Sequence, residues 1–203
     1  HEIADAVLMT WYPGEEGGHA VADIIFGDHS PSGRLPITFP ESLDQLPDYT
    51  DYSMKGRTYR YMTQRPMYPF GFGLSYSSFT YTDIQLAQDH ISSDEQTSVS
   101  CTVTNNGTVP ADEVVQLYIT DLEASAATPL FSLQGIQRIR LEPQGSTQVT
   151  FSITPEMLAL VNDQGERIIE KGDFEVSIAG SVPTTRAEEL GATKPATVIL
   201  ALE

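Results

Sequence analysis

Basic residues are scarce in this chain of 203 residues, in which 11 Lys and Arg stand against 28 Asp and Glu. The resulting formal net charge of -17 repels phosphate backbones and anionic lipid headgroups, so we expect no nucleic-acid partner and no membrane partner. Long apolar runs are also missing, because no stretch approaches the ~18 residues of a transmembrane helix. With 40% hydrophobic and 19% charged residues, the composition is typical of a packed fold rather than a disordered chain.

Metal-ligating residues are equally few. Cys101 is the only cysteine, which excludes an intrachain disulfide and a cysteine-based zinc site. The four histidines, His1, His19, His29 and His90, show no spacing typical of metal ligands. The sequence therefore predicts no metal site built from cysteines or histidines, and it offers no Ser-His-Asp arrangement for nucleophilic catalysis.

The front of the chain has the pattern of an α/β layer. Residues 6–11 form a short apolar run, which is typical of a parallel strand covered on both faces. A glycine-rich turn follows at residues 12–18, and residues 19–26 carry apolar side chains on one helical face up to Gly27, where a helix commonly ends. One strand–helix unit cannot close a sheet, so we expect the chain to be a fragment or a processed product. Residues 55–61 are expected to be extended.

From Phe79 onward the pattern changes to short strands with alternating apolar residues. Apolar side chains alternate with polar ones in residues 99–103, 115–119, 149–153 and 174–178, with turn residues between these runs. This spacing predicts an immunoglobulin or fibronectin type III-like β-sandwich. We therefore divide the chain into residues 1–75, an α/β segment with a connecting loop, and residues 76–203, an all-β sandwich.

The strand–turn junction carries the best candidate binding residues, Trp11, Tyr12, Glu15 and Glu16. Ligand clefts form at the carboxyl ends of strands in α/β sheets, and an aromatic ring beside a carboxylate suits a sugar. A phosphate site is disfavoured, because two carboxylates would face the anion and the glycine spacing fits no phosphate-binding motif. The alternative, a turn whose carboxylates are simply solvated, stays open.

A second group, Arg57, Tyr59 and Arg60, interleaves basic and aromatic side chains. In so acidic a chain, a role in nucleic-acid binding is disfavoured. Arginines in an extended segment more often pair with carboxylates across an interface, so we interpret these three residues as interface candidates.

Several blocks in order resemble glycoside hydrolase family 3, the β-glucosidase and β-xylosidase family. They are Trp11–Gly18, Phe26-Gly27-Asp28 with Pro31–Pro36, Gly56–Tyr61, Pro69–Tyr76, Val103–Gly107 and Glu113–Tyr118. The last two are similar to the fibronectin type III-like domain of that family. Tyr52–Lys55 before Gly56 is closest to the xylosidase-like branch.

The resemblance implies a retaining enzyme that hydrolyses terminal non-reducing β-D-glucosyl or β-D-xylosyl residues without a metal or cofactor. Family members place the nucleophilic Asp in a β/α barrel and the acid/base Glu in an earlier loop of the α/β sandwich, so this chain carries no catalytic residue. Glu15 and Glu16 do not match the acid/base motif. The expected partners are the missing barrel and the rest of the α/β domain, on the same polypeptide or a second chain, together with a β-linked oligosaccharide. We expect a secreted or periplasmic location rather than a cytoplasmic one.

Two other functions remain open. The chain could be a freestanding fibronectin-like module that binds a carbohydrate or a protein, which a row of exposed aromatic residues would favour. Among the alternating strands, only Tyr118 is predicted to point outward as such a residue. A purely structural domain without a ligand is the third possibility.

Overall fold

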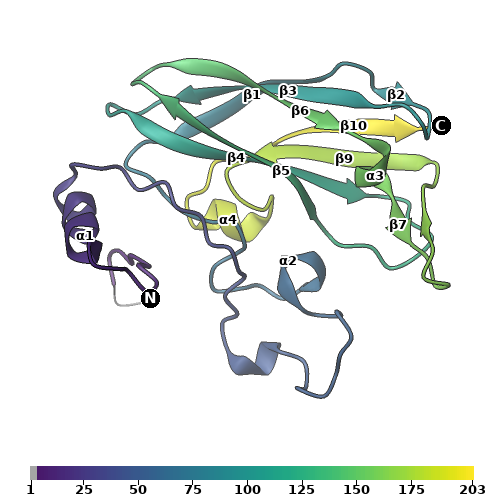
Figure 1. The fold of residues 1–203 in the computed structure, drawn as a ribbon, viewed down its shortest axis with the longest axis horizontal. Coiled ribbons are helices and arrows are strands. Elements are labelled where there is room, and N and C mark those ends of the chain that lie inside the picture. Colours follow the sequence, from purple (N-terminus) through teal and green to yellow (C-terminus); the bar gives the residue numbers. More distant parts are fainter. Residues whose placement is uncertain (1–3) are drawn as a thin grey trace.

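The computed structural model describes residues 4–203, so His1 lies outside the described part (Figure 1). Residues from Phe79 onward form a β-sandwich, and the preceding segment runs along one side of it with little regular structure. None of the helices in residues 4–203 combines the length and apolarity needed to span a bilayer. The elements are, in order, α1 (Gly17–Phe26), the 3-10 helix η1 (Leu43–Gln45), α2 (Thr58–Tyr61), β1 (Phe79–Leu86), β2 (His90–Ile91), β3 (Thr97–Asn105), β4 (Ala111–Asp121), β5 (Ser132–Leu141), β6 (Ser146–Ile153), α3 (Pro155–Leu158), β7 (Leu160–Val161), β8 (Arg167–Ile168), β9 (Gly172–Ala179), α4 (Thr185–Glu189) and β10 (Ala196–Leu202).

Two sheets pack face to face to form the sandwich. One has the strand order β1-β3-β6 and the other has the order β2-β10-β9-β4-β5, while β7 and β8 form a small separate hairpin. All pairs within the two large sheets are antiparallel except β2 with β10. This is the sandwich that the sequence predicts, and its strands include each of the four alternating runs.

The core of the sandwich follows from the alternation of apolar residues. In β3, Val99, Cys101 and Val103 are each 0% exposed, whereas the side chains between them are partly exposed. They meet Val115, Leu117, Val176 and Ile178 from the other sheet. Because fully burying one such aliphatic side chain contributes about 1.5–3 kcal/mol, this double layer supplies most of the stabilisation of the described fold.

Helix α1 confirms the helix predicted for residues 19–26. It begins two residues earlier, at Gly17, where a Cβ atom would lie 2.4 Å from Pro13. It ends at Gly27, which adopts the left-handed conformation (φ 82°) and donates its N–H to the carbonyl of Ile24. Only glycine adopts this end without steric strain.

The strand predicted for residues 6–11 is wrong as a description of this structure. These residues form no strand, and Val7 and Leu8 remain 59% and 45% exposed. A parallel strand forms only against a neighbouring strand, and among the described residues before β1 the sole pairing is an isolated bridge between Phe39 and Tyr68. The apolar run therefore lies open on the surface.

Two further expectations are wrong. Residues 55–61 are not extended throughout, because Thr58–Tyr61 forms the single turn α2 after a bend at Gly56 (φ 73°).

Tyr118 does not point into solvent but is 0% exposed. The outer face of β4 at this position is covered by Tyr59, whose ring meets that of Tyr118 edge-on with centroids 6.2 Å apart. A row of exposed aromatic side chains on this strand is therefore absent.

Candidate functional site

The candidate cleft segment, residues 11–18, lies on the surface at the start of α1 (Figure 1). Tyr12 is fully exposed and Trp11 is 49% exposed in a left-handed backbone conformation (φ 53°). Glu15 is exposed, and Glu16 accepts a hydrogen bond from Nδ1 of His19 at 2.6 Å. The structure therefore keeps the two aromatic rings and the two carboxylates together on one open turn, without enclosing them.

The two glutamates do not form a catalytic pair. A retaining glycosidase needs two carboxyl groups ~5–5.5 Å apart across the scissile bond, one of them kept protonated in a shaped cleft. Glu16 is instead committed to a surface pair with His19, in which the side chains are 80% and 85% exposed. What the segment can do chemically is bind: its rings can pack on apolar faces of a ligand, and its carboxylates can accept hydrogen bonds from hydroxyl groups.

A series of aromatic contacts connects this segment to the part of the chain that leads into β1. The ring centroids of Trp11 and Phe39 lie 6.3 Å apart, and Phe39 meets Tyr68 edge-on at 6.3 Å. Tyr68 in turn stacks on Phe72 at 6.1 Å, and Phe72 is only 8% exposed. No sequence pattern predicts this series, because its members come from three separate stretches that no periodicity relates.

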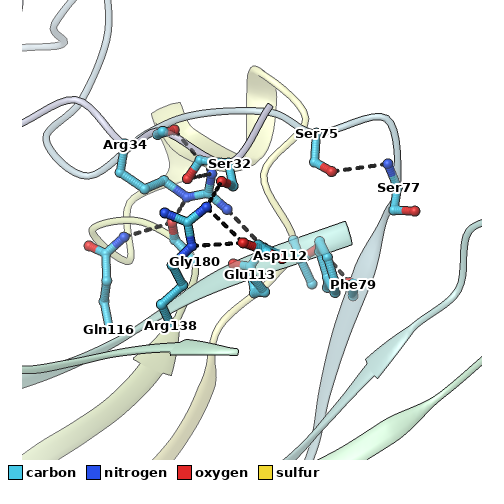
Figure 2. A network of polar contacts seen from close by, with 12 residues as sticks. Ser32, Arg34, Ser75, Ser77, Phe79, Asp112, Glu113, Gln116, Arg138 and Gly180 are labelled. Carbon is cyan, nitrogen blue, oxygen red and sulfur yellow. Dashed lines mark hydrogen bonds and ion pairs between the residues drawn. The ribbon is translucent and has the colours of Figure 1, made fainter. Parts of the chain in front are cut away.

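A buried ion pair fixes the loop after α1 to the sandwich, as Figure 2 shows. Nη2 of Arg34 lies 2.8 Å from Oε2 of Glu113 on β4, and its Nε donates to the carbonyl of Gly180 at 2.9 Å. The other carboxylate oxygen, Oε1, accepts the hydroxyl of Tyr81 at 2.7 Å. Burial, followed by the nearby Glu113 carboxylate, raises the pKa of Tyr81 well above its ordinary value, so its hydroxyl remains a donor.

A second set of polar contacts surrounds this pair (Figure 2). Arg138 on β5 donates from Nη2 to Oγ of Ser32 at 2.8 Å and lies 2.7 Å from a carboxylate oxygen of Asp112. Gln116 donates from Nε2 to the carbonyls of Gly71 and Gly180, at 3.2 and 2.8 Å. Side chains of β4 and β5 thus bind both the loop at residues 32–34 and the backbone at Gly71, and they fix these two segments to the sandwich.

Gly71 itself is required by this close approach. It has φ 72°, and a Cβ atom there would lie 2.4 Å from Oε1 of Gln116, which already accepts the hydroxyl of Tyr118 at 2.6 Å. Its presence in the Pro69–Tyr76 block is therefore explained by packing rather than by binding.

The three interface candidates have different roles. Tyr59 stacks on Phe70 with centroids 4.1 Å apart, and its hydroxyl accepts a hydrogen bond from the backbone N–H of Leu133 at 3.4 Å, which brings it against the sandwich. Arg57 does not pair with a carboxylate across the interface, but donates to the carbonyls of its own loop: Ser53 and Asp48 at 3.1 Å and Asp51 at 2.5 Å.

Arg60 reaches the sandwich through its backbone. Its carbonyl accepts the N–H of Leu130 at 2.7 Å. Within residues 4–203, its side chain takes part in no ion pair with a carboxylate.

Side chains that could hold a metal are not gathered anywhere in the described residues, which contain no cluster of three or more His, Cys, Asp or Glu suited to one. Cys101 lies in the sandwich core and donates from Sγ to the carbonyl of Thr82 at 3.2 Å. Burial raises the pKa of this thiol to about 11. It is therefore a protonated, inert core side chain at neutral pH.

Comparison with protein families gives two consecutive matches. Residues 1–76 match the family model described as "Glycosyl hydrolase family 3 C-terminal domain". Residues 113–182 match the one described as "Fibronectin type III-like domain". Together they cover both the open front segment and the centre of the sandwich.

Similar proteins extend over most of this chain. A "Putative beta-xylosidase" of Formosa agariphila is 45% identical over 184 residues, which are 89% of this chain and 24% of that protein. A "Periplasmic beta-glucosidase" of Salmonella typhimurium is 41% identical over 187 residues, 86% of this chain and 24% of its own length. The chain thus spans about a quarter of the length of these relatives.

Solved structures of β-glucosidases are also similar to this chain. A β-glucosidase from Erythrobacter marinus matches 95% of this chain with a TM-score of 0.79 and 35% identity, over 24% of its own length. A β-glucosidase from Listeria innocua, solved in complex with glucose, matches 95% of this chain with a TM-score of 0.77 and 28% identity, over 27% of its own length.

Proposed function

The chain belongs to glycosyl hydrolase family 3, and on that premise we propose that it serves as the C-terminal part of a retaining β-glycosidase. The whole enzyme would release terminal non-reducing β-D-glucosyl or β-D-xylosyl residues. Members with β-xylosidase and β-glucosidase names are both among the relatives, so both sugars stay within the proposal. The observation that carries it is the order of the two family matches, at residues 1–76 and 113–182, over a chain that spans about a quarter of its relatives.

The exposed apolar surface of the front segment supports an assignment as one part of a larger domain. Besides Val7, Leu8 and Trp11, the side chains of Ile25 and Phe26 on α1 are 66% and 81% exposed. The sandwich core, in contrast, is closed within the chain. Several large exposed apolar side chains within residues 7–26 indicate a surface that packs against another unit. We propose that this unit is the rest of the α/β domain and the β/α barrel, which would supply the nucleophile and the acid/base residue.

In that enzyme, Trp11, Tyr12, Glu15 and Glu16 would line or border the sugar cleft. Their contribution is binding: the rings offer faces for pyranose C–H groups, and the carboxylates accept hydroxyl hydrogens. The Arg34–Glu113 pair and the contacts of Gln116 would hold this wall at a fixed position relative to the sandwich. Tyr59 and Arg60 would stabilise the contact with the sandwich, Tyr59 by stacking and Arg60 through its backbone carbonyl, while Arg57 would hold its own loop together. The periplasmic relative supports a periplasmic or secreted location.

Hydrolysis of nitrophenyl glycosides tests this function. The 203-residue chain alone should release no nitrophenol from nitrophenyl β-xyloside or β-glucoside above a buffer blank, because residues 4–203 hold no pair of carboxylates facing each other in a cleft. The complete polypeptide encoded by the natural gene should release it. The proposal would be contradicted if the chain alone hydrolysed either substrate. It would also be contradicted if the complete polypeptide encoded by the natural gene contained no further catalytic domain.

A further inference from the structure

A groove of about 480 Å³ lies where the stretch from Tyr59 to Phe70 meets the sandwich. None of the residues that line it belongs to the candidate cleft segment at residues 11–18. Its size falls within the range of small-molecule sites, which combine apolar walls with a few convergent polar groups. This groove has both kinds of lining.

The apolar wall is rigid. Tyr59 and Phe70 line the groove and stack on each other, with an interplanar angle of 15°. Buried Tyr118 supports Tyr59 from behind, with an interplanar angle of 81°. Aromatic rings held in this way can receive the apolar face of a pyranose without losing side-chain freedom on binding.

The lining of the groove also carries cations beside a carboxylate. Nη2 of Arg65 and Nη1 of Arg186 lie 2.8 and 3.3 Å from Oε2 of Glu189. Hydrogen bonds from Arg65 and then Arg186 lower the pKa of Glu189, which keeps it an acceptor. A sugar hydroxyl both donates and accepts hydrogen bonds, so a guanidinium beside a carboxylate matches it.

We propose that this groove binds a neutral β-linked xylo- or gluco-oligosaccharide at a site separate from the sugar cleft; the choice of sugar rests on the proposed function. An anionic ligand fits less well. Nε and Nη2 of Arg186 already donate to backbone carbonyls of Pro66 and Met67, and the chain as a whole carries a net charge of -17. The groove would retain a polymeric substrate while another part of it enters the cleft.

Titration of the 203-residue chain with xylotetraose and cellotetraose, followed by amide NMR and calorimetry, tests the groove. We expect millimolar affinity for at least one of the two, with shift changes centred on Tyr59, Arg65 and Glu189. Glu189→Gln, which keeps the shape and removes the charge of the acceptor, should weaken binding about three- to tenfold. Glu188→Gln, the same change at the exposed neighbouring position on α4 that does not line the groove, is the matched control and should leave binding unchanged.

Three results would overturn the groove site. They are no binding of either sugar, equal affinity of the wild type and Glu189→Gln, and shift changes centred on residues 11–18. The groove site would also be overturned if binding disappeared in the longer polypeptide, because another segment would then occupy the groove. The proposed function fails separately: it is lost if the complete polypeptide has no glycosidase activity, even when the groove binds sugar.

Discussion

The guanidinium of Arg34 and the carboxylate of Glu113 are 2.8 Å apart, although they lie 79 positions apart in the sequence, and their side chains are only 9% and 3% exposed. This pair joins a loop of the front segment to the second sheet of the sandwich. A buried pair of this kind contributes little net stability compared with an apolar pair, but the loss of one partner leaves the other charge buried and uncompensated.

Arg34→Met should therefore lower the free energy of unfolding by about 3–5 kcal/mol. The matched control is Arg138→Met, because Arg138 makes a comparable contact with Asp112 but is 58% exposed, so its loss should cost less than about 1 kcal/mol. Urea unfolding of the three proteins measures both values. Equal losses for the two variants would show that burial does not distinguish these pairs.

Stability should fall at alkaline pH. Burial raises the pKa of the Cys101 thiol from its ordinary 9.0 to about 11, and it also raises the pKa of Tyr81 and Tyr118. The folded state therefore holds these protons more tightly than the unfolded state does. The contribution of Cys101 is fully present below pH 9 and is lost as the pH rises towards 11.

Urea unfolding at about pH 8 and about pH 10 measures this loss. Cys101→Ala should show a smaller decrease between the two pH values than the wild type, since it lacks one of the three groups. An unfolding free energy that stays constant or increases over this range would contradict the raised pKa values of the buried thiol and the two buried phenol groups.

Trp11 reports on the surface proposed to pack against the missing part of the α/β domain. It is the only tryptophan and is 49% exposed, so emission from this chain should be that of a partly hydrated indole that acrylamide quenches readily. In a longer polypeptide that restores the domain, the difference spectrum between the wild type and Trp11→Phe should shift to shorter wavelength, with weaker quenching. An unchanged spectrum would place Trp11 outside any restored interface.

The sandwich was predictable from the sequence because its determinants are local. Alternating residues such as Val99 and Val103 specify which face of a strand is buried, and the sandwich and the family resemblance are both confirmed. Helix α1 was predictable for the same reason, from the spacing of its apolar residues and from Gly27. The division of the chain at residues 75 and 76 stays a prediction.

The predictions that were wrong depend on contacts with residues far away in the sequence, or on contacts that the described residues do not provide. Residues 6–11 have the composition of a buried strand, but no strand among residues 4–203 pairs with them. Tyr118 alternates correctly along β4, yet its outer side is covered by Tyr59, which is 59 positions away in the numbering. No local sequence pattern predicts that a residue so far away in the chain covers this side of the strand. Similarly, the Arg34–Glu113 pair could not be predicted, because nothing in the sequence relates a loop arginine to that glutamate.

Replacement of the corresponding C-terminal quarter of the Formosa agariphila relative by this chain gives the most direct test of its proposed role. At 45% identity, the buried contacts of the two proteins should be similar enough for the hybrid to fold. The hybrid should hydrolyse nitrophenyl β-xyloside or β-glucoside, while this chain and the truncated relative should each be inactive alone. A folded hybrid without activity, or hydrolysis by this chain alone, would contradict the assignment of the chain as the C-terminal part of a β-glycosidase.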